Sequence, residues 1–246
     1  MLKDLNIKDC GEIAFKRAMS QIGPVKIESG KYSMVIESEV ASRLVTPVLN
    51  ALGGYSLQQK NSFMLDSLGK KMFPEWLNIW DRPVSVGETG SRLFDSEGVA
   101  TAEMPIVENG VVKEYFVNTY MSRKMGVEAT VEDATRPVVL PCFAPSVAEP
   151  VEATCGKEEL MRIVGEGILV TGFNGGNSNS ATGDFSFGVE GFLFKDGKIV
   201  HPVREMLITG NLLTLWNNLL AAGNDARFCK SKLIPTLAFG NVDFSA

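Results

Sequence analysis

The sequence predicts an α+β fold that is built mainly on antiparallel β-sheet, with helices flanking the sheet. Two turn dipeptides, Asn109-Gly110 and Asp196-Gly197, each lie between two short apolar stretches. Both dipeptides favour the positive backbone dihedrals of a two-residue hairpin turn, so each predicts a β-hairpin. Helical patterns occur between these hairpins without a regular strand-helix-strand alternation, which argues against a doubly wound parallel sheet.

The first elements follow from apolar patterns in chain order. Residues 3–22 carry apolar side chains among charged ones and predict an amphipathic helix that ends before Gly23-Pro24 and packs on the following domain. Residues 31–37 alternate imperfectly and predict a strand. Residues 38–52 predict a helix that ends at Gly53-Gly54.

Three further helices are predicted after residue 116. Residues 117–125 precede Gly126, residues 157–165 form a second helical pattern, and residues 211–222 present a broad apolar face. Residues 136–156 contain four prolines and are predicted to form an extended connection.

Composition and charge exclude several classes of protein. The chain has 246 residues, 45% of them hydrophobic, which is enough for one large domain or two small ones. Its net charge of -5, with scattered Lys and Arg, argues against direct nucleic-acid binding. The longest apolar runs are far shorter than the roughly 20 residues that span a bilayer. Because the first residues also lack the apolar stretch of a signal peptide, we expect no membrane association and a cytoplasmic location.

The cysteine and histidine content disfavours a self-contained metal site. The 4 cysteines are widely separated, so we expect free and mostly buried thiols and no disulfide framework. The chain has 1 histidine, His201, and so cannot supply a zinc site with several histidines.

Five short segments occur in a specific order along the chain. They are Ser-Gly-Lys-Tyr at 29–32, Trp-Asp-Arg-Pro at 80–83, Phe-Asp-Ser-Glu-Gly at 94–98, Thr-Gly-Asp-Phe-Ser at 182–186 and Gly-Asn-Asp at 223–225. Together with the two hairpins, this order resembles the C-terminal domain of the TldD/PmbA metallopeptidase family, also called modulators of DNA gyrase. The resemblance implies a sheet that is curled or forms a pseudo-barrel. We therefore expect an N-terminal helix and linker at 1–28, a domain of this type at 29–246, and no family N-terminal domain.

The resemblance also identifies a degenerate metal motif. Active family members carry H-E-x-x-x-H on the helix after the Gly-Lys-Tyr strand, where two histidines bind the metal and the Glu can activate water. In the same register this chain has Val45, Thr46 and Asn50. Val45 has no donor atom, Thr46 cannot act as a carboxylate base, and Asn50 is a poor ligand for zinc. Pro47 would in addition kink this helix unless it lies in the first turn. The peptidases have a Cys ligand after Gly-Asn-Asp, and Cys229 lies near that position.

These departures imply the TldE branch of the family, whose members lack the motif. We expect this chain to bind no metal and no other cofactor. Members of that branch pair with a TldD-like metallopeptidase subunit to form a peptidase that acts on unfolded peptides. A different hypothesis is a stand-alone homodimer that binds peptides and has a regulatory role. A third is a hydrolase with unrecognised catalytic residues.

A polar, glycine-rich segment at 172–188 is the candidate surface for a peptide or partner. A sheet edge can accept an extended peptide as an added strand, and glycines permit close approach of the backbone. The candidate residues of this segment, which offer hydrogen-bonding groups without charge, are Asn174, Asn177, Asn179, Thr182 and Ser186. Asp184 is expected to fix the turn and not to contact the ligand.

Other residues suggest catalysis less strongly than a structural role. Asp95 and Glu97 could form an acid-base pair, but two carboxylates beside a glycine more often form a solvated turn. Ser178, Ser180 or Ser186 could be a nucleophile only if His201 were the base. We expect His201 to be a half-exposed strand residue.

Overall fold

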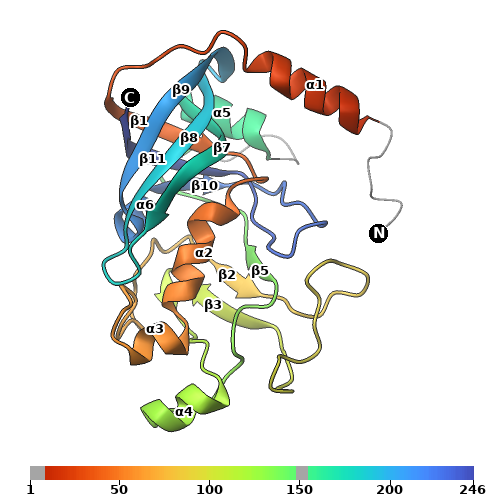
Figure 1. Ribbon diagram of the computed structural model, residues 1–246, viewed down its shortest axis with the longest axis vertical. Helices are drawn as coiled ribbons and strands as arrows, with labels where there is room; N and C mark the ends of the chain where they lie inside the picture. Colours follow the sequence, from red (N-terminus) through yellow and green to blue (C-terminus); the bar gives the residue numbers. More distant parts are fainter. Residues whose placement is uncertain (1–8, 148–154) are drawn as a thin grey trace.

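The computed structural model describes residues 9–147 and 155–246 (Figure 1). Its helices are α1 (Cys10–Ser20), α2 (Ser42–Ala51), α3 (Gly54–Gln58), α4 (Thr119–Met125), α5 (Lys157–Val164) and α6 (Leu212–Asn217). Its strands are β1 (Gly30–Ile36), β2 (Ile79–Asp81), β3 (Met104–Glu108), β4 (Val111–Val112), β5 (Pro137–Val139), β6 (Cys142–Phe143), β7 (Gly167–Ser178), β8 (Asp184–Lys195), β9 (Lys198–Asn211), β10 (Leu219–Ala222) and β11 (Leu237–Ser245). Within the described residues, each helix is too short or too polar to span a bilayer.

The larger sheet closes on itself. Its strands run in the order β1-β7-β8-β9-β11-β10-β6, and β1 also pairs with β11. The ring therefore consists of β1, β7, β8, β9 and β11, while β10 and β6 extend from β11. Only the β1–β7 pairing within the ring is parallel. The predicted α+β fold with a mainly antiparallel, curled sheet is confirmed.

A smaller antiparallel sheet lies beside α2. Its order is β4-β3-β2-β5, and Figure 1 shows α2 running from the barrel that the ring of strands forms to the level of this sheet. The larger hydrophobic cluster includes Phe187 and Phe239 of the barrel, Leu44 and Val48 of α2, and Ile79 of the small sheet. Because one continuous core joins all three layers, α2 is held in a fixed position.

A separate cluster covers the other face of the barrel strands. Leu160 and Met161 of α5 pack there against Val35, Leu169 and Phe194. These strand residues alternate with neighbours that belong to the larger cluster, such as the two that flank Val35. Both faces of the barrel strands are therefore buried here, in accord with the continuous apolar runs in β1 and β7.

The two predicted hairpin turns are confirmed. Asn109 and Gly110 have φ of 51° and 74°, and Asp196 and Gly197 have φ of 51° and 70°. These positive values belong to the tight turns that match the twist of antiparallel strands. The strands of the second hairpin are much longer than the apolar stretches that predicted it: β8 has 12 residues and β9 has 14.

Two predictions about helices need correction. Residues 211–222 were expected to form one helix, but α6 ends at Asn217 and residues 219–222 form β10. The β10 strand is stabilised by pairing with β11 and β6, which are distant in sequence. The N-terminal helix was expected to pack on the domain, yet no residue of α1 is buried. It contacts the domain through an ion pair between Arg17 and Glu39.

The extended connection predicted at 136–156 contains β5 and β6 within its described part. Its residues 148–154, and residues 3–8 of the predicted N-terminal helix, lie outside the described residues.

Candidate functional site

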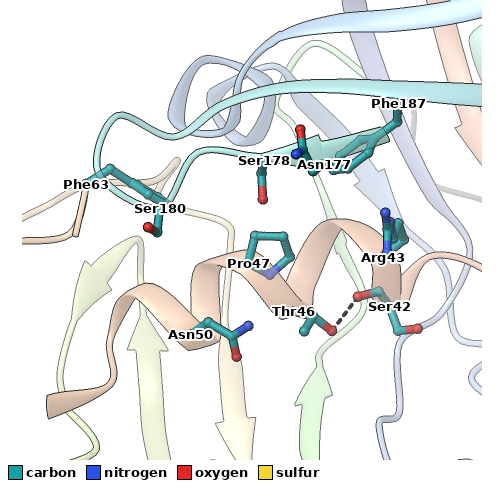
Figure 2. Close-up of a pocket in the computed structure, with 10 residues that line it drawn as sticks. All are labelled: Ser42, Arg43, Thr46, Pro47, Asn50, Phe63, Asn177, Ser178, Ser180 and Phe187. Carbon is teal, nitrogen blue, oxygen red and sulfur yellow. Dashed lines mark hydrogen bonds between the residues drawn. The ribbon is translucent and has the colours of Figure 1, made fainter. Parts of the chain in front are cut away.

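A groove of about 540 Å³ lies between α2 and the hairpin of β7 and β8 (Figure 2). One wall is α2, the other is the hairpin, and Phe63 closes one end. The residues that line it are Ser42, Arg43, Thr46, Pro47, Asn50, Phe63, Asn177, Ser178, Ser180 and Phe187.

The α2 wall follows from the helical repeat. Residues 42, 46 and 50, and the neighbouring 43 and 47, recur every four positions, so all five share one face of the helix. The opposite face is apolar and buried, and it includes Val45. Thr46 donates its hydroxyl hydrogen to the carbonyl of Ser42, with an O–O distance of 2.8 Å. Pro47 lies inside the helix, where it lacks the N–H that would bond the carbonyl of Arg43.

The hairpin wall is the outer half of β7 and β8 with the turn between them. β1 pairs with β7 only at residues 168–170. Within the described chain, the part of β7 from Gly172 to Ser178 therefore has β8 on one side and no strand on the other. Gly176 has φ of +89°, and a Cβ there would lie 2.0 Å from the carbonyl oxygen of Ser186. Only glycine fits this close pairing of the two strands.

Three hydrogen bonds fix the hairpin relative to the rest of the domain. Arg43 donates from Nη2 to the carbonyl of Gly176 at 2.7 Å. The backbone N–H of Phe63 donates to Ser180 at 2.9 Å, and that of Leu212 donates to Gly183 at 2.8 Å. The guanidinium of Arg43 also lies over the ring of Phe187, 5.0 Å from its centroid. The width of the groove is thus set by contacts on several elements.

The structure brings together some of the predicted site residues. Thr46 and Asn50, from the degenerate motif, line the same groove as Asn177 from the polar segment. Val45 is fully buried on the other face of α2 and cannot reach the groove. Ser178 and Ser180 line the groove as well, whereas Ser186 does not.

The other residues of the polar segment support the hairpin. Asn179 accepts a hydrogen bond from the N–H of Ala181 at 2.9 Å, which shapes the turn. Thr182 donates to Asp184 at 2.7 Å, and Asn211 donates to Asp184 at 3.0 Å, so Asp184 fixes the turn as expected. These two hydrogen bonds lower the pKa of the Asp184 carboxyl. The Asn174 side chain lies over Gly188, where a Cβ would be 2.1 Å from its Oδ1.

The donor atoms of the groove do not fit a catalytic zinc ion. None of its lining residues is His, Cys, Asp or Glu, the residue types that bind zinc in proteins. Throughout residues 9–147 and 155–246, no group of three or more such side chains is placed to hold a metal ion. Cys229 is exposed and does not line the groove.

No serine–histidine pair forms in the groove. His201 is half-buried on β9, where its Nδ1 lies 3.1 Å from the carbonyl of Pro202. It lines a different cavity beside α1, away from Ser178 and Ser180. The strand position expected for His201 is confirmed, and the geometry disfavours a serine-based mechanism.

Asp95 and Glu97 have structural roles, and Glu97 accepts hydrogen bonds from the backbone N–H and the hydroxyl of Thr119, both at 2.8 Å. Asp95 accepts hydrogen bonds from the N–H groups of Glu97, Val99 and Glu132 at 3.0, 2.9 and 3.2 Å. Burial raises its pKa, but these bonds and the charge of Arg92 together hold the pKa below its ordinary value. The turn-forming role is confirmed, while the expected solvation is wrong for Asp95, which is 3% exposed.

The cysteines are free, but only half of them are buried. Cys142 and Cys155 are buried, and burial raises their pKa values to about 12 and about 11. Cys10 and Cys229 are exposed. Buried thiols with raised pKa values are protonated at neutral pH and chemically inert.

The domain with this closed mixed barrel is similar to the C-terminal domain of known metallopeptidases. Residues 29–246 match the family described as PmbA/TldA metallopeptidase C-terminal domain. The chain is 35% identical over 215 residues to a metalloprotease PmbA homolog of Haemophilus influenzae, and 32% identical over 229 residues to metalloprotease PmbA of Escherichia coli O157:H7. The chain therefore belongs to the PmbA/TldD metallopeptidase family.

The matches cover most of this chain and about half of each relative. They span 87% and 90% of this chain but 46% and 48% of the two PmbA proteins. A crystal structure of a Bacteroides thetaiotaomicron protein, proposed as a modulator of DNA gyrase, is similar with a TM-score of 0.91 and 45% identity. That match covers 99% of this chain and 53% of the other. TldE from Thermococcus kodakarensis has the same fold, with a TM-score of 0.81 at 20% identity, covering 99% of this chain and 56% of the other.

Proposed function

We propose that this chain is a metal-less, TldE/PmbA-like subunit of a cytoplasmic metallopeptidase system that acts on unfolded peptides. The observation that carries the proposal is the chemistry of the groove beside α2. The helix positions that resemble the metal motif supply a hydroxyl and an amide to the groove, at Thr46 and Asn50. These groups bind peptides by hydrogen bonds and do not activate water.

The groove favours an extended peptide as its ligand. The outer half of β7 has an unpaired edge in the described structure, and a peptide backbone can add to such an edge as a further strand. Asn177, Ser178 and Ser180 offer uncharged donors and acceptors beside it. Backbone pairing with neutral side chains gives little sequence selectivity, which suits a system that acts on unfolded chains.

A bulky side chain at Asn177 tests this site. We expect Asn177→Trp to weaken binding of a dye-labelled, unstructured peptide by at least about tenfold, because the indole occupies the groove. Asn177 is exposed, so the melting temperature should change little. Fluorescence anisotropy measures binding, and thermal unfolding measures stability. The matched control is Thr209→Trp, an exposed position on β9 outside the groove, which should bind as the unchanged chain does. Equal binding by both variants would show that the groove is not the peptide site.

A second experiment tests the subunit role. The purified chain is expected to retain no stoichiometric zinc and to cleave no unstructured peptide. Mixed with a TldD-like subunit that carries H-E-x-x-x-H, it should form a hetero-oligomer with chelator-sensitive peptidase activity. Elemental analysis, light scattering and a peptide-cleavage assay measure the three properties. About one zinc per chain with activity in the absence of a partner would contradict the proposal. A peptide-binding homodimer that ignores the partner would instead support the stand-alone alternative.

A further inference from the structure

The groove contains one charged side chain, and no carboxylate of the described residues neutralises it. Arg43 is the only ionisable group among the lining residues, and the lining includes no Asp or Glu. The chain as a whole carries a net charge of -5, so this local positive charge is opposite to that of the whole molecule.

The guanidinium of Arg43 is held in place, and it keeps N–H groups that have no partner among the described residues. It donates one hydrogen bond to Gly176 and stacks on Phe187. Arginines such as Arg82, Arg92 and Arg227 pair with carboxylates, whereas no carboxylate of the described residues lies within ion-pair distance of Arg43. A guanidinium has five N–H donors, so Arg43 retains donors for a bidentate ligand.

Arg43 also has a defined place along the groove. Figure 2 shows Arg43 and Phe187 at one end, Phe63 at the other, and Pro47 and Ser178 between them. An extended peptide in the groove would therefore meet the positive charge at one end only, and neutral groups along the rest.

We propose that Arg43 binds a carboxylate of the peptide, so that the groove selects for a negatively charged group at the Arg43 end. The inference rests on the proposed peptide-binding function and adds a specificity-determining residue to it. The carboxylate can be the C-terminus of the peptide or the side chain of Asp or Glu. The planar guanidinium is already oriented by Gly176 and Phe187, so it can form paired hydrogen bonds with either kind of carboxylate.

Three unstructured peptides distinguish the sources. They share a dye at the N-terminus and contain no internal acidic residue. The first has a free C-terminus, the second a C-terminal amide, and the third an amide with Glu as its last residue. We expect the first peptide to bind about ten times more tightly than the second. If the third peptide binds as tightly as the first, the site also accepts side-chain carboxylates. If it binds as weakly as the second, the site accepts only a C-terminal carboxylate.

Variants assign the preference to Arg43. Arg43→Gln is expected to bind the acid and amide peptides equally, with the affinity that the unchanged chain has for the amide. The matched control is Arg123→Gln on α4, which removes an exposed arginine outside the groove and should retain the tenfold preference. Arg43→Lys keeps the charge without the planar fork and should retain part of the preference.

The outcomes separate this inference from the proposed function. Equal binding of acid and amide peptides by the unchanged chain overturns the role of Arg43 and leaves peptide binding intact. Failure to bind any of the peptides overturns both. A preference that persists in Arg43→Gln also overturns the assignment. If Arg43→Gln binds neither peptide, Arg43→Lys decides, because a retained preference supports the inference and a lost one contradicts it.

Discussion

Replacing Trp216 with Ala is expected to lower the free energy of unfolding by about 3–5 kcal/mol. Trp216 is fully buried on α6, and its ring meets those of Phe73 and Phe239 edge-on, with centroids 6.5 and 5.5 Å away. Its Nε1 donates to the carbonyl of Leu44 in α2 at 3.3 Å. The substitution would leave a cavity where the barrel, α2 and the segment before the small sheet meet. Urea denaturation followed by circular dichroism measures the change.

Two further variants serve as comparisons for Trp216→Ala. Trp216→Phe keeps an aromatic ring but loses the hydrogen bond to α2, so we expect an intermediate loss of about 1–2 kcal/mol. Phe228→Ala removes a ring that is 67% exposed and should change the free energy of unfolding by less than about 0.5 kcal/mol. A similar effect for Trp216→Ala and Phe228→Ala would mean that the three layers do not share one core.

Replacing Asp95 with Ala is expected to cost about 2–4 kcal/mol of stability. The change removes the acceptor for three backbone N–H groups, including that of Glu132 from a distant segment. Chemical denaturation at neutral pH measures the loss. Glu75→Ala is the control, because among the described residues this exposed carboxylate forms a surface ion pair with Lys71. Its loss should change the free energy of unfolding by less than about 1 kcal/mol. Equal effects of the two changes would contradict the structural role of Asp95.

The stability contributed by Asp95 should also depend on pH in a defined direction. Because the folded state lowers its pKa below the ordinary value of 3.8, the ionised carboxylate stabilises the fold above that pH. This contribution is lost as the pH falls through the lowered pKa. The stability difference between the unchanged chain and Asp95→Ala should therefore be constant from about pH 5 to 7 and shrink below about pH 4. If this stability difference instead grew as the pH fell, the lowered pKa of Asp95 would be contradicted.

Local signals in the sequence were sufficient for many elements. Asn109-Gly110 and Asp196-Gly197 determine their turns by their own dihedral preferences, and the structure has the expected positive φ values. The signals for α4 are equally local. The helix begins after Asn118, whose side chain caps it, and it ends at Gly126, which has φ of 70°. Such signals depend on a few neighbouring residues, so they are visible without knowledge of the rest of the fold.

The errors arise where distant pairing overrides local pattern. Residues 219–222 continue an apolar helical pattern, yet their pairing with β11 and β6 makes them a strand. The segment 172–188 looked like a polar loop, but it forms the outer half of a hairpin, because its glycines allow the two strands to approach closely.

The groove was predictable only in part for the same reason. Asn177 was identified from its polar surroundings, and Thr46 and Asn50 from the family resemblance. Arg43 was not identified, because its contact with Gly176 joins residues 133 positions apart. The one local signal was the polar stripe at 42, 43, 46 and 50, which marks a face of α2 that does not enter the core.

The closure of the barrel has a consequence for the synthesis of the protein. β11 follows every other strand of the ring in sequence, and it joins β1 by pairs such as Gly30 with Phe244. While the chain grows on a ribosome, β1 and β9 must each keep an open edge until residues 237–245 have emerged. Exposed strand edges invite pairing with other nascent chains. A chain that lacks residues 237–245 would therefore leave both of these edges open.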